Sequence, residues 1–468
     1  MKRSDKLFLN TLIIAIGTFT TKVLSFIMVP FYTLWLSPSE YGNFDLLISY
    51  IAFFIPFATF QLEQSVFRFS LSNKKEAKRY YTNAVSRVFV NILICNIIII
   101  LLLHKQPFMI PFMIYFDFYA LYNCASEYLR GTDRLKLYSA TNIFVALIIV
   151  VLNILLVYVC QLQVSGMLWS YAIAYLLGFI MIAWLEKLSY FKFYKNREIQ
   201  KEMLAYSLPL IPNSISWSIT HITDRTMIRM VMGSFYNGIY AISCKIPTLV
   251  NILFSIFSLS WQQTAISSVN DADKNTFYNG IYFDLIKFLY TSAMVIIALT
   301  PFLFRYFIQK EYFIGIYQIP IILNGIIFLS LAQFMNAIFL ATKDTKSVGL
   351  TTVIAAIINF VINILFIKSL GLFAASLSTF VSYLVLFFLR QKKLSTIFQN
   401  REVIRMILKY NVVYILLSLI LYVPFQFFWN LFCLISALGL FFLYNKRLLN
   451  TILYKFRKGA KKHENLNC

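Results

Sequence analysis

A single lysine interrupts a long apolar stretch near the start of the chain. Between Leu7 and Ser39 the only charged residue is Lys22, which lies near the middle of the stretch. Roughly 20 apolar residues suffice to cross a bilayer, so the stretch is typical of a transmembrane helix. A cation at the centre of such a helix costs about 2.5 to 3.5 kcal/mol even on the translocon scale. A charge kept at that cost indicates either an anionic ligand or a buried ion pair with an acid on a neighbouring helix.

A polar stripe marks a second apolar segment, centred near residue 218. Its members recur at three- or four-residue intervals, so they share one face of a helix. They are Ser214, Ser218, His221, Arg225 and Arg229, with Trp217 close to the same face. Lipid cannot satisfy such side chains, so this face must meet a neighbouring helix or a water-filled cavity. A structural polar seam between helices is the alternative to a binding role.

Cations outnumber acids within the apolar segments. The basic candidates for a cationic, substrate-binding cavity are Lys22, Arg225, Arg229, Lys245, Arg68 and Arg87. A diphosphate would suit such a cavity, because arginine binds phosphate through a rigid bidentate fork. Snorkelling to the membrane surface also accounts for Arg68 and Arg87. The intramembrane acids Asp45, Asp117 and Asp224 are candidates for ion coupling or for charge partners of these cations.

Several aromatic, amide and imidazole side chains are candidates for polar or sugar contacts. They are Gln61, Gln64, Trp217, His221, Trp261, Gln262 and Gln263. A tryptophan ring can stack on a sugar face, although core packing is its more common role. Amide groups hydrogen-bond sugar hydroxyls and neighbouring helices equally well.

Motifs for catalysis or for cofactors are missing from the sequence. There is no P-loop, no G-x-S-x-G elbow and no G-x-G-x-x-G turn. The six cysteines are scattered without a C-x-x-C pair, and the three histidines lack ligand-like spacing. We therefore expect no catalytic residue, no metal site and no cofactor.

The elements that position these residues are membrane helices. The 468 residues are 60% hydrophobic and only 13% charged, whereas soluble domains carry about 25% charged residues. The apolar runs predict fourteen spans, and the first is too long for a cleavable signal peptide. The net charge of +23 falls mainly on alternate links. Lysine and arginine mark cytoplasmic loops, so both termini are predicted to be cytoplasmic and nucleic-acid binding is not expected.

The chain also repeats itself. TNIFVALIIVVLNILLV at 141–157 aligns without a gap with TTVIAAIINFVINILFI at 351–367, which brings Asn153 onto Asn363. An even number of helices per repeat keeps both copies in the same orientation. The sequence therefore predicts an all-α polytopic membrane protein with two six-helix lobes in parallel repeat around a central cavity. The predicted parts are lobes at 1–190 and 204–390, a cytoplasmic link at 191–203, two additional transmembrane helices at 391–445 and a basic cytoplasmic tail at 446–468.

Particular stretches resemble a known family. They are the opening "NTL…KVLSF…PFYTLWLSPSEYGNFDLL", Arg68 at the end of the second span, and "DRTMI…GSFYNGIYAISCKI", in which Gly238 matches Gly42 of the first hairpin. They are similar to the polysaccharide transporter family, the Wzx-type oligosaccharide flippases of the multidrug/oligosaccharidyl-lipid/polysaccharide exporter superfamily. The likeness runs through residues 1–390.

The resemblance implies a function in the bacterial inner membrane. Members of this family move undecaprenyl-diphosphate-linked oligosaccharide from the cytoplasmic to the outer leaflet, for O-antigen, capsule or exopolysaccharide assembly. The implied partners are this lipid-linked glycan, membrane lipids, and a glycan polymerase or other assembly proteins.

Three alternatives stay open. A multidrug/cation antiporter of the same superfamily would need acids to dominate its cavity. A lipid II flippase would share the architecture and the chemistry. A glycan polymerase or ligase enzyme would need a large outer loop, whereas the predicted outer links are short.

Overall fold

The computed structural model describes residues 3–103, 106–188, 196–269, 271–342, 344–398 and 400–464, which form helices and short connections without a strand. The α-helices are α1 (Arg3–Trp35), α2 (Pro38–Thr59), α3 (Leu62–Ser72), α4 (Ala77–Leu103), α5 (Met109–Gly131), α6 (Leu135–Asn153), α7 (Gln163–Leu185), α8 (Arg197–Ser207), α9 (Ile211–Met232), α10 (Ser234–Lys245), α11 (Thr248–Ser267), α12 (Lys274–Phe307), α13 (Ile319–Ala341), α14 (Thr345–Leu370), α15 (Leu372–Lys393), α16 (Asn400–Ser418) and α17 (Phe427–Glu464). Short π or 3-10 segments are η1 (Ile154–Val159), η2 (Leu208–Leu210), η3 (Lys310–Gln318) and η4 (Leu419–Tyr422).

The predicted all-α, polytopic membrane class is confirmed. Within the described residues, 11 helical segments are long and apolar enough to cross a membrane. Helices also occupy the remaining three predicted spans, as α1, α5 and α9, but these are not among the 11. In α9 the polar stripe itself lowers the hydropathy. The number of fourteen spans therefore stays a prediction.

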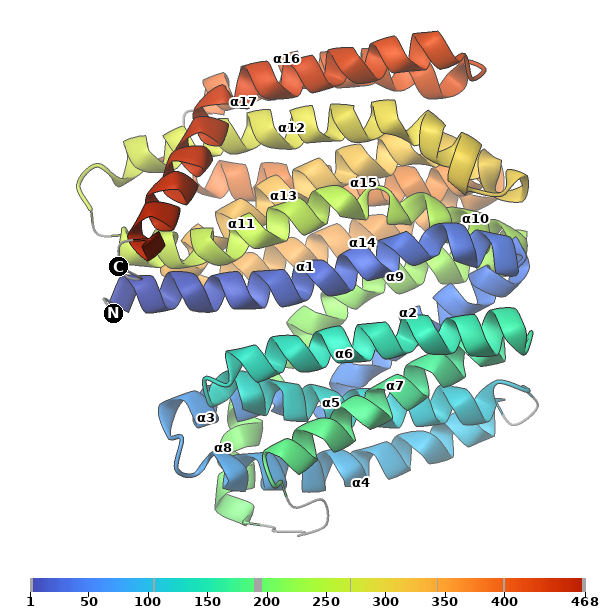
Figure 1. The fold of residues 1–468 in the computed structure, drawn as a ribbon, viewed down its shortest axis with the longest axis vertical. Coiled ribbons are helices and arrows are strands. Elements are labelled where there is room, and N and C mark those ends of the chain that lie inside the picture. Colours follow the sequence, from blue (N-terminus) through green and yellow to red (C-terminus); the bar gives the residue numbers. More distant parts are fainter. Residues whose placement is uncertain are drawn as a thin grey trace. The chain divides into compact units, whose positions relative to one another are not determined.

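The chain forms two compact units. The first contains Met1–Ala241 with Asn359–Ala375, and the second contains Ile242–Ile358 with Ser376–Cys468. Their boundaries do not test the predicted lobes, which stay a prediction. In the first unit α5 packs against α3, α4 and α7, α1 packs along α6, and α2 packs on α9 (Figure 1). In the second unit α12 contacts α11, α13, α16 and α17 (Figure 1).

Local chemistry sets the bounds of α2. The S-P-S-E sequence at its start forms a capping box, in which the N-cap Ser37 accepts from the Glu40 backbone and Glu40 accepts from the Ser37 backbone. At its other end Phe60 and Gln61 have φ values of 52° and 54°. Two successive left-handed residues cannot continue a helix, and each costs about 1–2 kcal/mol. The second predicted span is therefore divided into two helices, α2 and α3.

Two glycines at matched positions of the sequence repeat lie at one close crossing, between α2 and α10. A Cβ atom on Gly42 would overlap the carbonyl of Ser234, and one on Gly238 would overlap the carbonyl of Pro38. Only glycine permits backbones to approach this closely. Asn237 fixes the same crossing, because its Nδ2 donates to the Gly42 carbonyl at 2.6 Å.

The matched polar residues of α6 and α14 make the same local bonds. The hydroxyls of Thr141 and Thr351 each donate to the carbonyl four residues earlier, at 2.9 and 2.8 Å. The amides of Asn153 and Asn363 do likewise, at 2.7 and 3.0 Å. All four residues are buried. Such bonds pair the donor groups of polar side chains with the carbonyls of their own helix.

Candidate functional site

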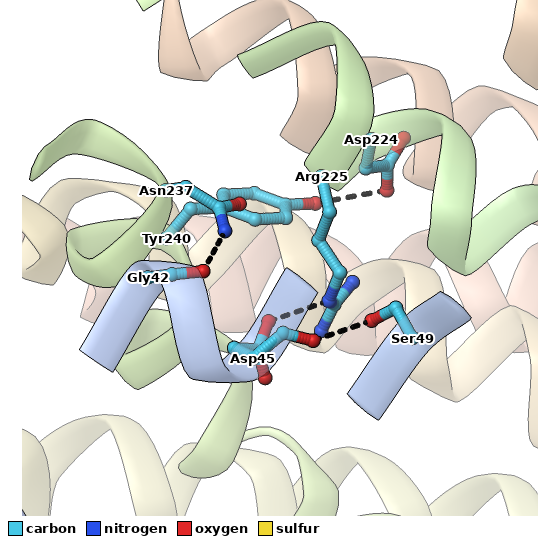
Figure 2. Close-up of polar contacts among 7 residues, drawn as sticks. All are labelled: Gly42, Asp45, Ser49, Asp224, Arg225, Asn237 and Tyr240. Atoms are coloured by element: carbon cyan, nitrogen blue, oxygen red, sulfur yellow. Dashed lines mark hydrogen bonds and ion pairs between the residues drawn. The ribbon is translucent and has the colours of Figure 1, made fainter. Parts of the chain in front are cut away.

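Arg225 forms an ion pair inside the first unit. Its Nε lies 2.6 Å from Oδ2 of Asp45, and both side chains are 11% exposed (Figure 2). The pair joins α9 to α2. Ser49, one turn further along α2, donates its hydroxyl to the Asp45 carbonyl at 2.8 Å (Figure 2). A nearly buried pair of this kind stabilises each charge by the presence of the other.

A second member of the polar stripe also meets α2. The Ser218 hydroxyl lies 3.2 Å from the Ala52 carbonyl and 3.2 Å from the carbonyl of Ser214, on its own helix. Ser218 and Arg225 are two turns apart, so this face of α9 packs along α2. At Ser218 and Arg225 the polar stripe thus forms a structural polar contact between two helices, which is the alternative to a binding role.

Asp224 sits beside Arg225 in the sequence but has different neighbours. Its Oδ2 accepts from the Tyr240 hydroxyl at 3.1 Å (Figure 2). Its Oδ1 accepts from the amides of Asn359 and Asn363, at 3.1 and 2.8 Å. The residue is 2% exposed. A hydroxyl and two amides therefore donate to this buried carboxylate.

Lys22 has a different setting from Arg225. It lies on α1 and is half-buried. Among the side chains that the structure describes, it has no hydrogen-bond or ion-pair partner. No acidic side chain that the structure describes therefore pairs with the Lys22 ammonium group.

The remaining cationic candidates are scattered over the two units. Arg68 on α3 and Arg229 in the last turn of α9 are exposed. Arg87 on α4 is half-buried, with its guanidinium carbon 5.6 Å from the centre of the Phe60 ring. Lys245 at the end of α10 is half-buried and belongs to the second unit. Within the first unit, Arg225 alone of these predicted cations has an ion pair among the described residues.

The third acid candidate, Asp117, lies on α5 with an amide neighbour. It accepts a hydrogen bond from Asn96 Nδ2 at 2.9 Å, and no cation pairs with it among the described residues.

Gln61 is buried at the break between α2 and α3, whereas Gln64 on α3 is half-buried.

Of the two tryptophans predicted to stack on a sugar, the structure describes the side chain of Trp261. Trp261 packs in the core of the second unit, where its indole N–H donates to the Phe334 carbonyl at 2.9 Å and its ring stacks on Phe334 at 4.2 Å. Gln262, next to it, is exposed. The side chains of Trp217, His221 and Gln263 lie outside the described residues.

Three contributors to this site carry little signal in the sequence. Asn363 matches Asn153 in the repeat, Tyr240 lies in the second hairpin, and Asn359 belongs to no motif. The spacing of Asn359 and Asn363, four residues apart on α14, could have indicated that both face one partner.

The long apolar helices and the buried charges define a polytopic membrane protein. Residues 7–261 match the family described as "Polysaccharide biosynthesis protein". This match covers more than half of the chain, so the protein belongs to that family, and the resemblance found in the sequence is confirmed. Residues 248–443 match the family described as "Lipid II flippase MurJ".

Solved structures share the fold. A lipid II flippase MurJ in an inward closed conformation matches with a TM-score of 0.74 and 15% identity, over 94% of this chain and 100% of that chain. An inward-facing multidrug resistance MATE family transporter of the MOP superfamily matches with a TM-score of 0.60 and 13% identity, over 83% and 98%. A MOP superfamily transporter from Pyrococcus furiosus matches with a TM-score of 0.54 and 13% identity, over 83% of this chain and 96% of that chain.

At these identities the likeness shows the fold alone. These three proteins are described as one flippase and two transporters. A comparison with curated protein sequences gives no match.

Proposed function

We propose that the protein is a flippase. It moves undecaprenyl-diphosphate-linked oligosaccharide repeat units from the cytoplasmic to the outer leaflet of a bacterial inner membrane, by alternating access, and supplies O-antigen, capsule or exopolysaccharide assembly. The observation that carries the proposal is the membership of residues 7–261 in the polysaccharide biosynthesis family. The fold shared with a lipid II flippase supports it further.

The charges inside the helices support an anionic substrate. Lys22 has no acid partner among the described side chains, so its ammonium group is available to attract the diphosphate. Arg225 is the second proposed contact, and its ion pair with Asp45 would have to open or to share the arginine with phosphate. Asp224 is the proposed ion-coupling acid, because it is a carboxylate that lies buried on a membrane helix, α9.

Two alternatives of the same superfamily have specific support. The match of residues 248–443 to the MurJ family favours a lipid II flippase. The likeness to MATE transporters, together with Asp45, Asp117 and Asp224, favours a cation antiporter. The cation excess of the apolar segments argues against the antiporter, because an organic cation would be repelled.

A reconstitution experiment tests the proposal. Purified protein in sealed vesicles would receive a fluorescent undecaprenyl-diphosphate-linked oligosaccharide, lipid II, or an organic cation dye. No ATP is added, because the sequence has no nucleotide-binding motif and transport must use mass action, a gradient or the membrane potential. An impermeant quencher then reports the fraction of lipid that has changed leaflet.

The outcomes separate the candidates. We expect the oligosaccharide lipid to equilibrate faster than in protein-free vesicles. Faster movement of lipid II alone would identify a lipid II flippase. Uptake of the dye alone would identify a cation antiporter. A strict need for ATP with no partner protein would contradict all three.

Reporter fusions test the predicted topology. Fusions after residue 195 and at the C-terminus should both report a cytoplasmic location.

A further inference from the structure

The first unit contains a cavity that none of the proposed transport residues line. Its volume is about 350 Å³, and its walls come from α1, α5, α6 and α7. Hydroxyl and amide groups contribute much of this wall, together with aliphatic side chains. The polar lining includes Ser25, Tyr119, Tyr122, Asn123, Asn142 and Tyr175. Every lining residue is uncharged.

Tyrosine rings hold one side of the cavity in place. Tyr175 of α7 packs against three tyrosines of α5, with ring centres 5.6 Å from Tyr115, 5.0 Å from Tyr119 and 5.3 Å from Tyr122. Gly178 lets α7 come this close, because a Cβ there would lie 2.9 Å from the Tyr122 ring. Rings fixed by one another form a preorganised wall, which reduces the entropy lost on binding.

The amide of Asn142 is also fixed in direction. Its Oδ1 accepts from the Tyr122 hydroxyl at 2.9 Å, and its Nδ2 donates to the Tyr138 carbonyl at 2.9 Å. Phenylalanine would pack as well as tyrosine in an apolar lobe. A hydroxyl inside such a lobe costs free energy unless it is hydrogen-bonded. A tyrosine hydroxyl that donates one bond within the wall, as that of Tyr122 does, can still accept another, so the repeated tyrosines offer acceptors to a ligand or water in the cavity.

The lining decides the chemical class of that ligand. A diphosphate or an organic cation would lose its hydration without an opposite charge, at a cost of several kcal/mol. A lipid chain would make no hydrogen bond with the hydroxyl and amide groups that line the cavity. A neutral sugar offers hydroxyls for the polar groups and a C–H face for the rings. The volume lies near the lower end of the roughly 300–1,000 Å³ of small-molecule sites, which suits one or two sugar rings.

We propose that this cavity binds a neutral sugar residue of the lipid-linked glycan. The inference rests on the proposed function, which supplies the glycan. It adds a carbohydrate subsite inside the first unit that is separate from the groups that would meet the diphosphate.

Binding measurements in nanodiscs test the subsite. The probes are undecaprenyl diphosphate alone and the same lipid carrying N-acetylglucosamine, N-acetylgalactosamine or galactose. Dissociation constants come from native mass spectrometry. For the wild type we expect at least one sugar to tighten binding by about tenfold or more over the sugar-free lipid.

Three variants locate the effect. Ala146→Phe fills the cavity from α6 and should remove the gain from the sugar, without changing the affinity for the sugar-free lipid. Leu147→Phe is the matched control, because Leu147 is the next residue and is 47% exposed. Tyr119→Phe with Tyr175→Phe keeps the rings and removes two hydroxyls, so it should weaken the gain even if Ala146→Phe does not fold.

The failures are distinguishable. If the wild type binds the sugar-free lipid but gains nothing from any of the three sugars, the subsite is overturned and the flippase proposal stands. A gain that persists in both Ala146→Phe and the double tyrosine variant also overturns it. If Ala146→Phe does not fold, a gain that persists in the double tyrosine variant is enough to overturn the subsite. If no undecaprenyl diphosphate lipid binds at all, the proposed function itself has failed.

Discussion

Asp45 and Arg225 lie 180 residues apart in the chain, yet their side chains meet at 2.6 Å with little exposure to solvent. Removing one partner of such a pair strands a buried charge, which costs about 3–5 kcal/mol. Removing both leaves no stranded charge, so the two single variants and the double variant should behave differently.

The first prediction concerns this pair. Arg225→Met should lower the folded yield in membranes, because it leaves Asp45 unpaired, whereas Arg225→Lys should retain more of it. The variant with both Arg225→Met and Asp45→Asn should recover the yield. Size-exclusion profiles of detergent extracts measure the folded fraction. Equal yields for the single and the double variant would contradict a structural pair.

The same double variant tests the substrate role of Arg225. If the arginine contacts phosphate, glycan export per folded molecule should fall even where the yield has recovered. Normal export by this variant would remove Arg225 from the substrate site.

Lys22 should show the opposite signature. It has no acid partner among the described side chains, so Lys22→Met should leave the folded yield close to that of the wild type. Export of lipid-linked glycan should fall, because the attraction for the diphosphate is lost, and Lys22→Arg should preserve it. Lys136→Met, at an exposed lysine of α6, is the control for general loss of charge. Normal export by Lys22→Met at wild-type membrane levels would exclude the lysine from the site.

The glycine crossing gives a prediction about stability. Gly42→Ala and Gly238→Ala each force a methyl group into a backbone carbonyl, so each should destabilise the fold by about 1–3 kcal/mol or more. Gly280→Ala is the matched control, because nothing lies within 4 Å of its Cβ position on α12. Alanine there should be neutral or stabilising. The melting temperature of the purified protein measures both effects, and equal melting temperatures for all three variants would refute the crossing.

Arg390 of the second unit gives the last prediction. It is 0% exposed and donates to the Ala332 carbonyl at 2.8 Å and to the hydroxyls of Thr351 and Thr352 at 3.2 and 3.1 Å. No acid pairs with it among the described residues, so its removal strands no opposite charge. Arg390→Met should therefore cost less stability than Arg390→Lys, which keeps a buried charge without the fork that satisfies it. A lower melting temperature for the methionine variant would show that an acid compensates the arginine.

The apolar runs predicted the positions of the long helices because a bilayer demands continuous apolar segments. The break between α2 and α3 was not predicted. Phenylalanine and glutamine are not residue types that favour the left-handed conformation, so nothing in their identity indicates a break. Helical spacing likewise placed Arg225 on a polar face. It could not identify Asp45 as the partner, because a single sequence carries no information on which helices touch.

The crossing of Gly42 and Gly238 has a consequence for the origin of the protein. If the two halves descend from one ancestral six-helix chain, these glycines were once the same residue in two identical subunits. Their contact was then isologous, so any mutation of that residue acted on both sides of the dyad at once. Gene fusion ended this coupling and let each side vary alone. The crossing still excludes a side chain from both sides, so fusion doubled the number of positions at which selection must retain glycine.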